Sequence, residues 1–339
     1  MKFSQVKKKY RKYLMVKQNV LGFGYGTKVK KGKKTGKAVV SVLVSKKKPL
    51  SLLSSKDIIP KSLNGMPTDV LEVGKIKIQD FVPLTNDEHT AKYRPAIGGI
   101  SIGHKDITAG TFGCVVYKNN IPYILSNNHV LANSNDADKG DAIYQPGPYD
   151  GGTYFDRIAV LEDYVEIDFG GESIVCKIAM FVLWLLNWLT QFVNKKYRWS
   201  LTKSSSKVNY VDAAIAKPLS SELIEDKILK IGKIKGTVKP VLGMQVQKSG
   251  RTTGYTTGTI DVIDASVTVN YGEGKEAVFE EQIITGPISQ GGDSGSAVFD
   301  MNNNLVGLLF AGSDQVTILN PIARVFELLD LSLKPCCEE

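Results

Sequence analysis

The stretch Gln290–Asp300, QGGDSGSAVFD, places one serine between glycines and an aspartate, directly before a short apolar run. Glycine, aspartate and serine gather in tight turns for backbone reasons alone, because glycine accepts a positive φ and the short polar side chains bond nearby backbone groups. A serine held at such a turn can also be an exposed nucleophile. The stretch therefore predicts either a structural hairpin or a nucleophile at Ser294, and the second interpretation requires partners elsewhere in the chain.

The base that such a nucleophile needs is predicted at His129. A serine hydroxyl is weakly nucleophilic near neutral pH, so a neighbouring base must accept its proton. The chain has three histidines. His89 lies in the polar stretch NDEHTAK and His104 in GHKD, and both are expected on the surface. His129 follows the apolar run of YILSNNHV, where the end of a strand would hold its ring in place.

The carboxylate that would orient the base is predicted at Asp212, which interrupts the apolar run NYVDAAIA. Burying a carboxylate is costly unless the group finds a partner, and a buried imidazole is such a partner. An aspartate that caps a turn at the first residue of a strand is the structural alternative. Asp156, Asp163 and Asp168 are weaker candidates for the same role.

These three residues carry a family resemblance. His129, Asp212 and Ser294 lie in LSNNHVLA, VDAAIA and GGDSGSAVF, and in this order they resemble the motifs of chymotrypsin-like (trypsin-fold) serine peptidases. The stretch KSGRTTGYTTGTI, residues 248–260, is similar to the second-barrel hairpin of the bacterial alpha-lytic and streptogrisin branch. The resemblance extends from about Gly99 to the C-terminal helix. It implies a mainly β fold of two six-stranded antiparallel β-barrels, with the site in the cleft between them.

The resemblance also implies a role for each matched residue. Ser294 would attack the scissile carbonyl, His129 would take its proton and pass it to the leaving amine, and Asp212 would orient His129. The backbone N–H groups of Gly292 and Ser294 would form the oxyanion hole. A glycine suits that position because a turn of positive φ favours a residue without Cβ.

Substrate-binding residues follow from the same matching. Phe310, Ala311 and Gly312 would pair with the substrate backbone as a strand, and Ile288 and Ser289 would form the floor of the specificity pocket. Ile288 stands where trypsin-like enzymes carry an aspartate, so we expect selection of a small or apolar side chain rather than arginine or lysine. No cofactor and no metal are expected, because the four cysteines show no metal-ligand spacing with the histidines.

The chain is expected to be organised in three parts. Residues 1–85 would form a basic N-terminal α/β domain with a helix in 1–18 and a following β-hairpin, and 86–98 would be a linker. Residues 99–339 would be the peptidase domain, ending in a helix that Asn320 caps and Pro321 begins. An apolar helical insert at about 172–200 interrupts this domain. A 339-residue chain that is 42% hydrophobic and 23% charged is long enough and apolar enough for such globular domains.

Two segments lie outside the resemblance and suggest partners besides a protein or peptide substrate. Residues 1–60 hold 17 lysines and arginines against Asp57 alone, a net charge of +16, so with +9 overall the remaining residues carry −7. Such a segment could contact nucleic acid or an anionic membrane, or it could lie on the acidic surface of its own chain. Residues 178–199 could pack on the body or on a second copy, lie at a membrane surface, or act as a flap over the substrate.

The expected function is a cytoplasmic serine endopeptidase of bacterial type. The N-terminal stretch MKFSQVKKKYRKYLMVKQNV lacks the apolar core of a secretory signal. Peripheral membrane association through the insert is compatible with this location. The peptidase could be constitutively active, or latent with its cleft covered by the N-terminal domain or the insert. The alternative is a binding module that keeps the peptidase fold without catalysis and whose basic N-terminal domain contacts nucleic acid or anionic membrane.

Overall fold

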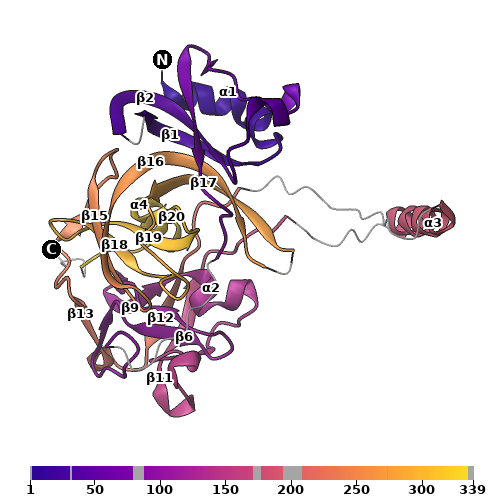
Figure 1. The fold of residues 1–339 in the computed structure, drawn as a ribbon. Coiled ribbons are helices and arrows are strands. Elements are labelled where there is room, and N and C mark those ends of the chain that lie inside the picture. Colours follow the sequence, from indigo (N-terminus) through magenta and orange to yellow (C-terminus); the bar gives the residue numbers. More distant parts are fainter. Residues whose placement is uncertain are drawn as a thin grey trace.

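Two β-barrels and an N-terminal α/β unit make up most of the chain (Figure 1). The structure is a computed structural model, and it describes residues 2–30, 33–78, 88–170, 177–193, 208–272 and 274–334. Its elements are mainly strands, as predicted. The cysteines other than Cys114 lie outside the described residues.

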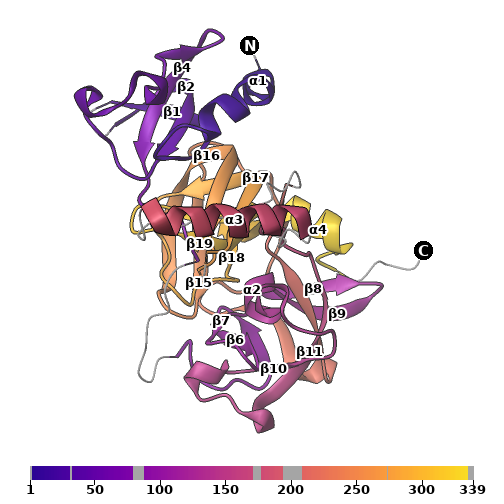
Figure 2. The ribbon, with the colours of Figure 1, turned by 90° about the vertical axis from the view of Figure 1, so that its right-hand side faces the viewer.

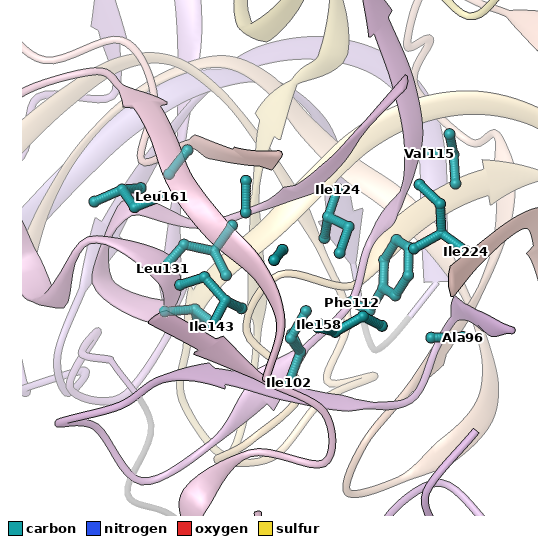
Figure 3. Close-up of a cluster of buried hydrophobic side chains, with 14 of the residues drawn as sticks. Ala96, Ile102, Phe112, Val115, Ile124, Leu131, Ile143, Ile158, Leu161 and Ile224 are labelled. Atoms are coloured by element: carbon teal, nitrogen blue, oxygen red, sulfur yellow. The ribbon is translucent and has the colours of Figure 1, made fainter. Parts of the chain in front are cut away.

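The first barrel is built mainly from six strands. Their order is β6 (Ser101–His104), β10 (Ala142–Tyr144), β11 (Arg157–Tyr164), β12 (Ala214–Pro218), β9 (Ile121–Ser126) and β8 (Cys114–Lys118). The short β7 (Gly110–Thr111) pairs with β6 and leads directly into β8, which pairs with β9. Buried aliphatic side chains and Phe112 fill the interior (Figure 3). Burial of this apolar surface is the main term that stabilises the barrel.

The second barrel also has six strands. Their order is β15 (Gln245–Gly250), β18 (Ala297–Asp300), β19 (Asn304–Gly312), β20 (Thr317–Pro321), β17 (Glu276–Thr285) and β16 (Gly254–Asn270). The additional pairing of β15 with β16 closes the ring. All six pairings are antiparallel, so the predicted pair of six-stranded antiparallel barrels is confirmed.

Short elements join and cover the barrels. The strands β5 (Ala96–Gly98) and β13 (Ile224–Ile228) pair in parallel, and β14 (Gly236–Thr237) pairs with β19. Helix α4 (Ile322–Leu329) follows β20, and its buried side chains enter a cluster with residues of both barrels. Asn320 does not cap this helix as expected. Its side chain instead bonds inside the protein, accepting from the backbone N–H of Asp212, and Pro321 takes the N-cap position.

The N-terminal unit extends the sheet of the second barrel. Helix α1 (Phe3–Met15) covers a sheet of β1 (Val20–Lys30), β2 (Lys33–Val44), β4 (Met66–Glu72) and β3 (Ser62–Leu63). The outer side of β1 pairs with β16, so the sheet runs without a break into the barrel (Figure 2). The glycines of VLGFGYG allow this close approach, since a Cβ on Gly22 would lie 2.3 Å from the carbonyl oxygen of Ser266.

Basic residues of α1 contact acidic residues of the second barrel. Lys7 lies 2.5 Å from Asp264 and 2.8 Å from Glu280, and Arg11 lies 2.5 Å from Glu280. Burial would raise the pKa of Glu280, but hydrogen bonds from Lys7, Ser266 and Arg11 outweigh burial and lower it. Part of the basic N-terminal segment therefore neutralises the chain's own acidic surface.

Helix α3 (Lys177–Val193) is the apolar insert, and it lies apart from both barrels (Figure 1). Leu183, Asn187 and Thr190 lie on one side of it and are partly buried, whereas the other large apolar side chains between residues 181 and 190 are exposed: Phe181, Val182, Trp184, Leu185, Leu186, Trp188 and Leu189. The structure therefore does not show this helix packed on the barrels of its own chain. The residues that flank the helix lie outside the described residues. Within the described ranges, no helix has both the length and the apolar character needed to cross a membrane.

Candidate active site

His129 lies on a turn that fixes its backbone between the two barrels. Strand β9 ends at Ser126, and the short helix α2 (Asn128–Leu131) begins two residues later. The side-chain amide of Asn127 donates to the backbone carbonyl of Asp212 at 2.7 Å, which ties this turn to the chain that leads into β12. The apolar strand β9 and the polar residues that follow it thus place the His129 imidazole at the end of this strand, at the rim of the first barrel.

Asp212 is fully buried and bonds directly to His129. Its Oδ2 lies 2.6 Å from Nδ1 of His129, and its Oδ1 accepts from the backbone N–H of His129 at 3.2 Å. A carboxylate can only accept, so Nδ1 carries the proton and Nε2 keeps a free lone pair. Among the described residues none bonds to Nε2, although that atom is buried. The pair therefore presents a proton acceptor to the space beside it.

Tyr271 is a third donor to Asp212, and sequence reasoning did not identify it. Its hydroxyl donates to Oδ2 at 2.7 Å, and its ring stands edge-on to His129 with 6.2 Å between centroids. Burial raises the pKa of the Tyr271 phenol well above its usual value, and the charge of Asp212 raises it further. The phenol therefore stays protonated at neutral and moderately alkaline pH. Tyr271 sits in the hairpin between β16 and β17, 59 positions from Asp212, so no local signal connects the two residues.

Ser294 lines the same cavity as His129. The cavity has a volume of about 400 Å³, and its lining includes His129, Tyr271, Gly292 and Ser294. Ser294 belongs to the turn before β18 and is 7% exposed. No hydrogen bond joins its hydroxyl to His129 in the described structure. The structure therefore brings the predicted nucleophile and base to one cavity, with the base already paired to its carboxylate.

The turn at Gly292 fits the role expected of an oxyanion hole. Gly292 has φ of +99°, and a Cβ there would lie 2.3 Å from Oγ1 of Thr252, so both conformation and space require glycine. Its carbonyl accepts from the Thr111 hydroxyl at 2.9 Å, which holds the peptide plane. Within the described residues, the N–H groups of Gly292 and Ser294 have no acceptor. Two such donors can stabilise a developing negative charge.

Asp293 holds this turn from inside the protein. Its carboxylate is fully buried and accepts hydrogen bonds from the N–H groups of Thr252, Thr253 and Gln290 and from the Thr253 hydroxyl, at 2.7–3.1 Å. Lys248 Nζ lies 3.3 Å away and is also fully buried. Burial lowers the pKa of Lys248, and Asp293 opposes this effect. The hairpin GRTTG, residues 250–254, thus fixes the turn that carries Ser294 through its hydrogen bonds to Asp293.

A second buried ion pair joins the two barrels. Arg251, at the end of β15, donates from Nε to Oδ2 of Asp150 at 2.9 Å, and its Nη2 lies 2.5 Å from Oδ1. Both side chains are almost fully buried. Because Asp150 belongs to the first barrel, this bidentate contact fixes the hairpin of the second barrel against the first.

The predicted substrate-binding residues are buried near the site but do not line the cavity. The side chain of Ile288 packs in the core of the second barrel, and its backbone N–H donates to the Thr317 hydroxyl at 3.1 Å. Ser289 bonds the same hydroxyl at 2.8 Å. Phe310, Ala311 and Gly312 form the last residues of β19.

The other histidines are not surface residues, contrary to expectation. His89 is 5% exposed, and its Nδ1 lies 2.8 Å from the Gly99 carbonyl oxygen. His104 is 1% exposed, and its Nε2 lies 3.1 Å from Asp141. Polar neighbours in the sequence suggested exposure, but tertiary partners form hydrogen bonds with both rings.

The weaker candidates for the carboxylate that orients the base have other partners. Asp156 pairs with Lys92, and Asp163 pairs with Lys118 and Lys139. The backbone N–H of Asp168 donates to the side chain of Asn209.

No family model and no curated protein sequence matches this chain. A solved glutamic-acid-specific serine protease is 19% identical, with 70% of this chain and 100% of that chain covered and a TM-score of 0.45. Cellulomonas bogoriensis chymotrypsin is 17% identical, with 70% and 97% covered and a TM-score of 0.43. Nocardiopsis protease is also 17% identical, with 70% and 98% covered and a TM-score of 0.45. The solved structures to which this chain is similar are thus bacterial trypsin-like serine proteases.

Proposed function

We propose that this protein is a serine endopeptidase that hydrolyses peptide bonds through an acyl-enzyme. The observation that carries the proposal is the buried His129–Asp212 pair, whose Nε2 lies without a partner on the cavity that Ser294 also lines. Leaving a buried imidazole nitrogen unbonded costs free energy, and a catalytic role for its lone pair explains why the fold tolerates that cost. The substrate class proposed is protein or peptide.

The proposed reaction uses side chains and backbone groups of this chain together with one water molecule. Oγ of Ser294 attacks the scissile carbonyl carbon, and its proton moves to Nε2 of His129. The tetrahedral oxyanion accepts hydrogen bonds from the N–H groups of Gly292 and Ser294. The carbon–nitrogen bond then breaks, and Nε2 returns the proton to the leaving amine. A water molecule then attacks the acyl ester and gives its proton to Nε2 of His129. The ester C–O bond breaks, and Nε2 returns the proton to Oγ of Ser294. Asp212 stabilises the imidazolium of His129 in both halves of the reaction.

We also keep the proposal that Ile288, Ser289 and the strand Phe310–Gly312 bind the substrate. The apolar character of Ile288 favours a small or apolar side chain before the scissile bond.

Latency is proposed over constitutive activity, because Lys77 and Ile78 line the same cavity as Ser294. We propose a cytoplasmic location, which suits the free buried thiol of Cys114.

A fluorophosphonate probe tests the peptidase proposal directly. We expect covalent labelling of the full-length protein at Ser294, abolished in Ser294→Ala and reduced at least a hundredfold in His129→Ala, because the hydroxyl loses its base. Labelled peptides identified by mass spectrometry give the site. Ser221→Ala is the matched control, since it removes an exposed serine of a surface turn outside the cavity and should leave labelling in place. Labelling that persists in Ser294→Ala would contradict the assignment.

The binding-module alternative has one supporting feature, the net charge of residues 1–60. Two of these basic residues, Lys7 and Arg11, already pair with acidic residues of the second barrel. If the folded protein is not labelled at all, a salt-sensitive gel shift with nucleic acid, or binding to anionic vesicles, would favour the alternative.

Helix α3 supports a second candidate role at a membrane surface. Its exposed apolar side chains include Trp184 and Trp188, and a broad exposed apolar side of this kind suits the boundary of a membrane. We expect the full chain to co-sediment with anionic phospholipid vesicles, and Trp184→Ser/Trp188→Ser to lower the bound fraction at least fivefold. Tyr154→Ser/Phe155→Ser is the control, because it removes exposed aromatic rings from another site. Concentration-dependent dimers without vesicle binding would instead support self-association through residues 178–199.

A further inference from the structure

The chain segment that leaves the N-terminal unit pairs with the end of β19 in the second barrel. The backbone N–H of Lys77 donates to the Gly312 carbonyl at 3.1 Å, and the N–H of Gly312 donates to the Lys77 carbonyl at 3.0 Å. This reciprocal pair is an antiparallel bridge between two residues 235 positions apart. The last residue of β19 thus has its edge occupied by a strand from the same chain.

The other side of the segment bonds to the end of β16. The N–H of Ile78 donates to the Asn270 carbonyl at 3.0 Å, and the N–H of Asn270 donates to the Ile76 carbonyl at 3.2 Å. Asn270 directly precedes Tyr271, whose hydroxyl bonds Asp212. Residues 76–78 therefore fill the space between two strand ends, of which the end of β16, at Asn270, lines the cavity.

Buried side chains hold the segment in this register. Val73 and Ile76 are 1% and 3% exposed, and they enter a cluster that includes Phe310 and Ala311. The hydroxyl of Ser313 donates to the Val73 carbonyl. The segment is thus fixed by side chains on one face and by backbone bonds at its edges.

The segment also reaches the proposed catalytic residues. Lys77 and Ile78 line the 400 Å³ cavity together with His129, Gly292 and Ser294. An extended peptide binds to an exposed strand edge through such backbone bonds, and pockets for alternate side chains add selectivity. A substrate that reached Ser294 along β19 would need the same Gly312 N–H and carbonyl that Lys77 uses.

We propose that residues Ile76–Ile78 occupy the groove in which the substrate backbone binds, and that this segment is an intramolecular competitor of peptide substrates. The inference rests on the proposed peptidase function for the identity of the groove. The occupant is covalently attached, so its effective concentration reaches about the millimolar range, and a free peptide must displace it. The groove accordingly takes extended peptides of the type VGKIKI, the sequence of residues 73–78.

Binding of a free peptide tests the occupancy independently of catalysis. The probe is fluorescein-labelled VGKIKI with an amidated C-terminus, measured by fluorescence anisotropy on full-length Ser294→Ala protein. Lys77→Pro in this background removes the N–H that donates to Gly312, so we expect the peptide to bind at least tenfold more tightly. Lys77→Ala is the matched control, because it keeps the backbone N–H and should bind as weakly as the parent.

A second peptide, VGKIPI, should bind none of these proteins, since it lacks the same donor. Ile78→Pro replaces Lys77→Pro as the releasing variant if the latter does not fold, because it removes the donor to Asn270. Full-length variants are used since β1 pairs with β16, and a shortened chain would expose that strand. Equal affinity of all variants for VGKIKI, or no binding by the releasing variants, would overturn the proposal.

Labelling by fluorophosphonate separates this inference from the peptidase proposal. In proteins that keep Ser294, we expect Lys77→Pro to be labelled about tenfold faster than either the wild type or Lys77→Ala. Tighter peptide binding without any labelling would refute the peptidase and support the occupied groove. Equal labelling of all three proteins, with unchanged peptide affinity, would refute the occupied groove and support a peptidase that is open to substrate.

Discussion

Asp212→Asn is expected to lower kcat for peptide hydrolysis by about 10⁴-fold with the fold retained, the scale of this replacement in a Ser-His-Asp triad. Asp212 accepts three hydrogen bonds, from the backbone N–H and Nδ1 of His129 and from the hydroxyl of Tyr271. An asparagine of the same shape has only one acceptor oxygen. Its NH₂ group must therefore face at least one of these donors.

Either orientation of the asparagine amide impairs the base. With NH₂ toward Nδ1, the imidazole must move its proton to Nε2, which can then no longer accept the proton of Ser294. With NH₂ toward the backbone N–H of His129, two donors face each other and the turn is displaced. The measurement is steady-state hydrolysis of a fluorogenic peptide by the variant and the wild type, with circular dichroism to confirm folding.

Two further variants calibrate this result. Tyr271→Phe removes one of the three donors and keeps the charge of Asp212, so we expect a loss of about tenfold. Asp163→Asn changes a carboxylate that pairs with Lys118 and Lys139 away from the site, and it should keep wild-type activity. An Asp212→Asn protein that retains more than a tenth of wild-type activity would contradict the assigned role.

Asp293→Ala is expected to lower the free energy of unfolding by about 3–5 kcal/mol, the usual range when one partner of a buried ion pair is removed. Asp293 and Lys248 are both fully buried. The substitution leaves the Lys248 ammonium without its counter-charge and the donors of Thr252, Thr253 and Gln290 without an acceptor. Urea unfolding followed by circular dichroism gives the difference.

The deficit should shrink as the pH rises from 7 toward 10. Burial lowers the pKa of Lys248 in the folded protein, so the unfolded chain binds more protons and stability rises with pH. Without Asp293 this pKa falls further, and a neutral lysine no longer needs the carboxylate. Asp300→Ala is the control, because Asp300 accepts hydrogen bonds in a turn without a buried cation and should cost about 1–2 kcal/mol at every pH. A deficit that does not change with pH would argue against the ion pair.

The local patterns of the chain were sufficient to predict its elements. The apolar run before His129, the hairpin of residues 20–44 and the helix in residues 1–18 all appear close to the expected places. Burial periodicity and turn residues act over a few positions, so one sequence is enough to locate them. The order of the three motifs, together with the resemblance, further predicted the two barrels.

Contacts between distant segments could not be predicted in this way. Tyr271 reaches Asp212 from a hairpin of the other barrel, and Asn320 turns inward to the Asp212 backbone instead of capping a helix. His89 and His104 are buried although their neighbours in the sequence are polar. A polar side chain becomes buried where partners from elsewhere satisfy it, and those partners are known only once the chain is folded.

The sequence by itself determined the residue types that acyl transfer needs, including the nucleophile candidate Ser294 in QGGDSGSAVFD, because that chemistry requires a hydroxyl, an imidazole and a carboxylate. The tertiary structure alone decided how these groups are supported and what lies beside them. It paired Asp293 with Lys248 under the turn, and it laid residues 76–78 along the edge of β19. Backbone pairing of this kind uses the N–H and carbonyl groups that every residue except proline carries, so no side-chain pattern predicts it.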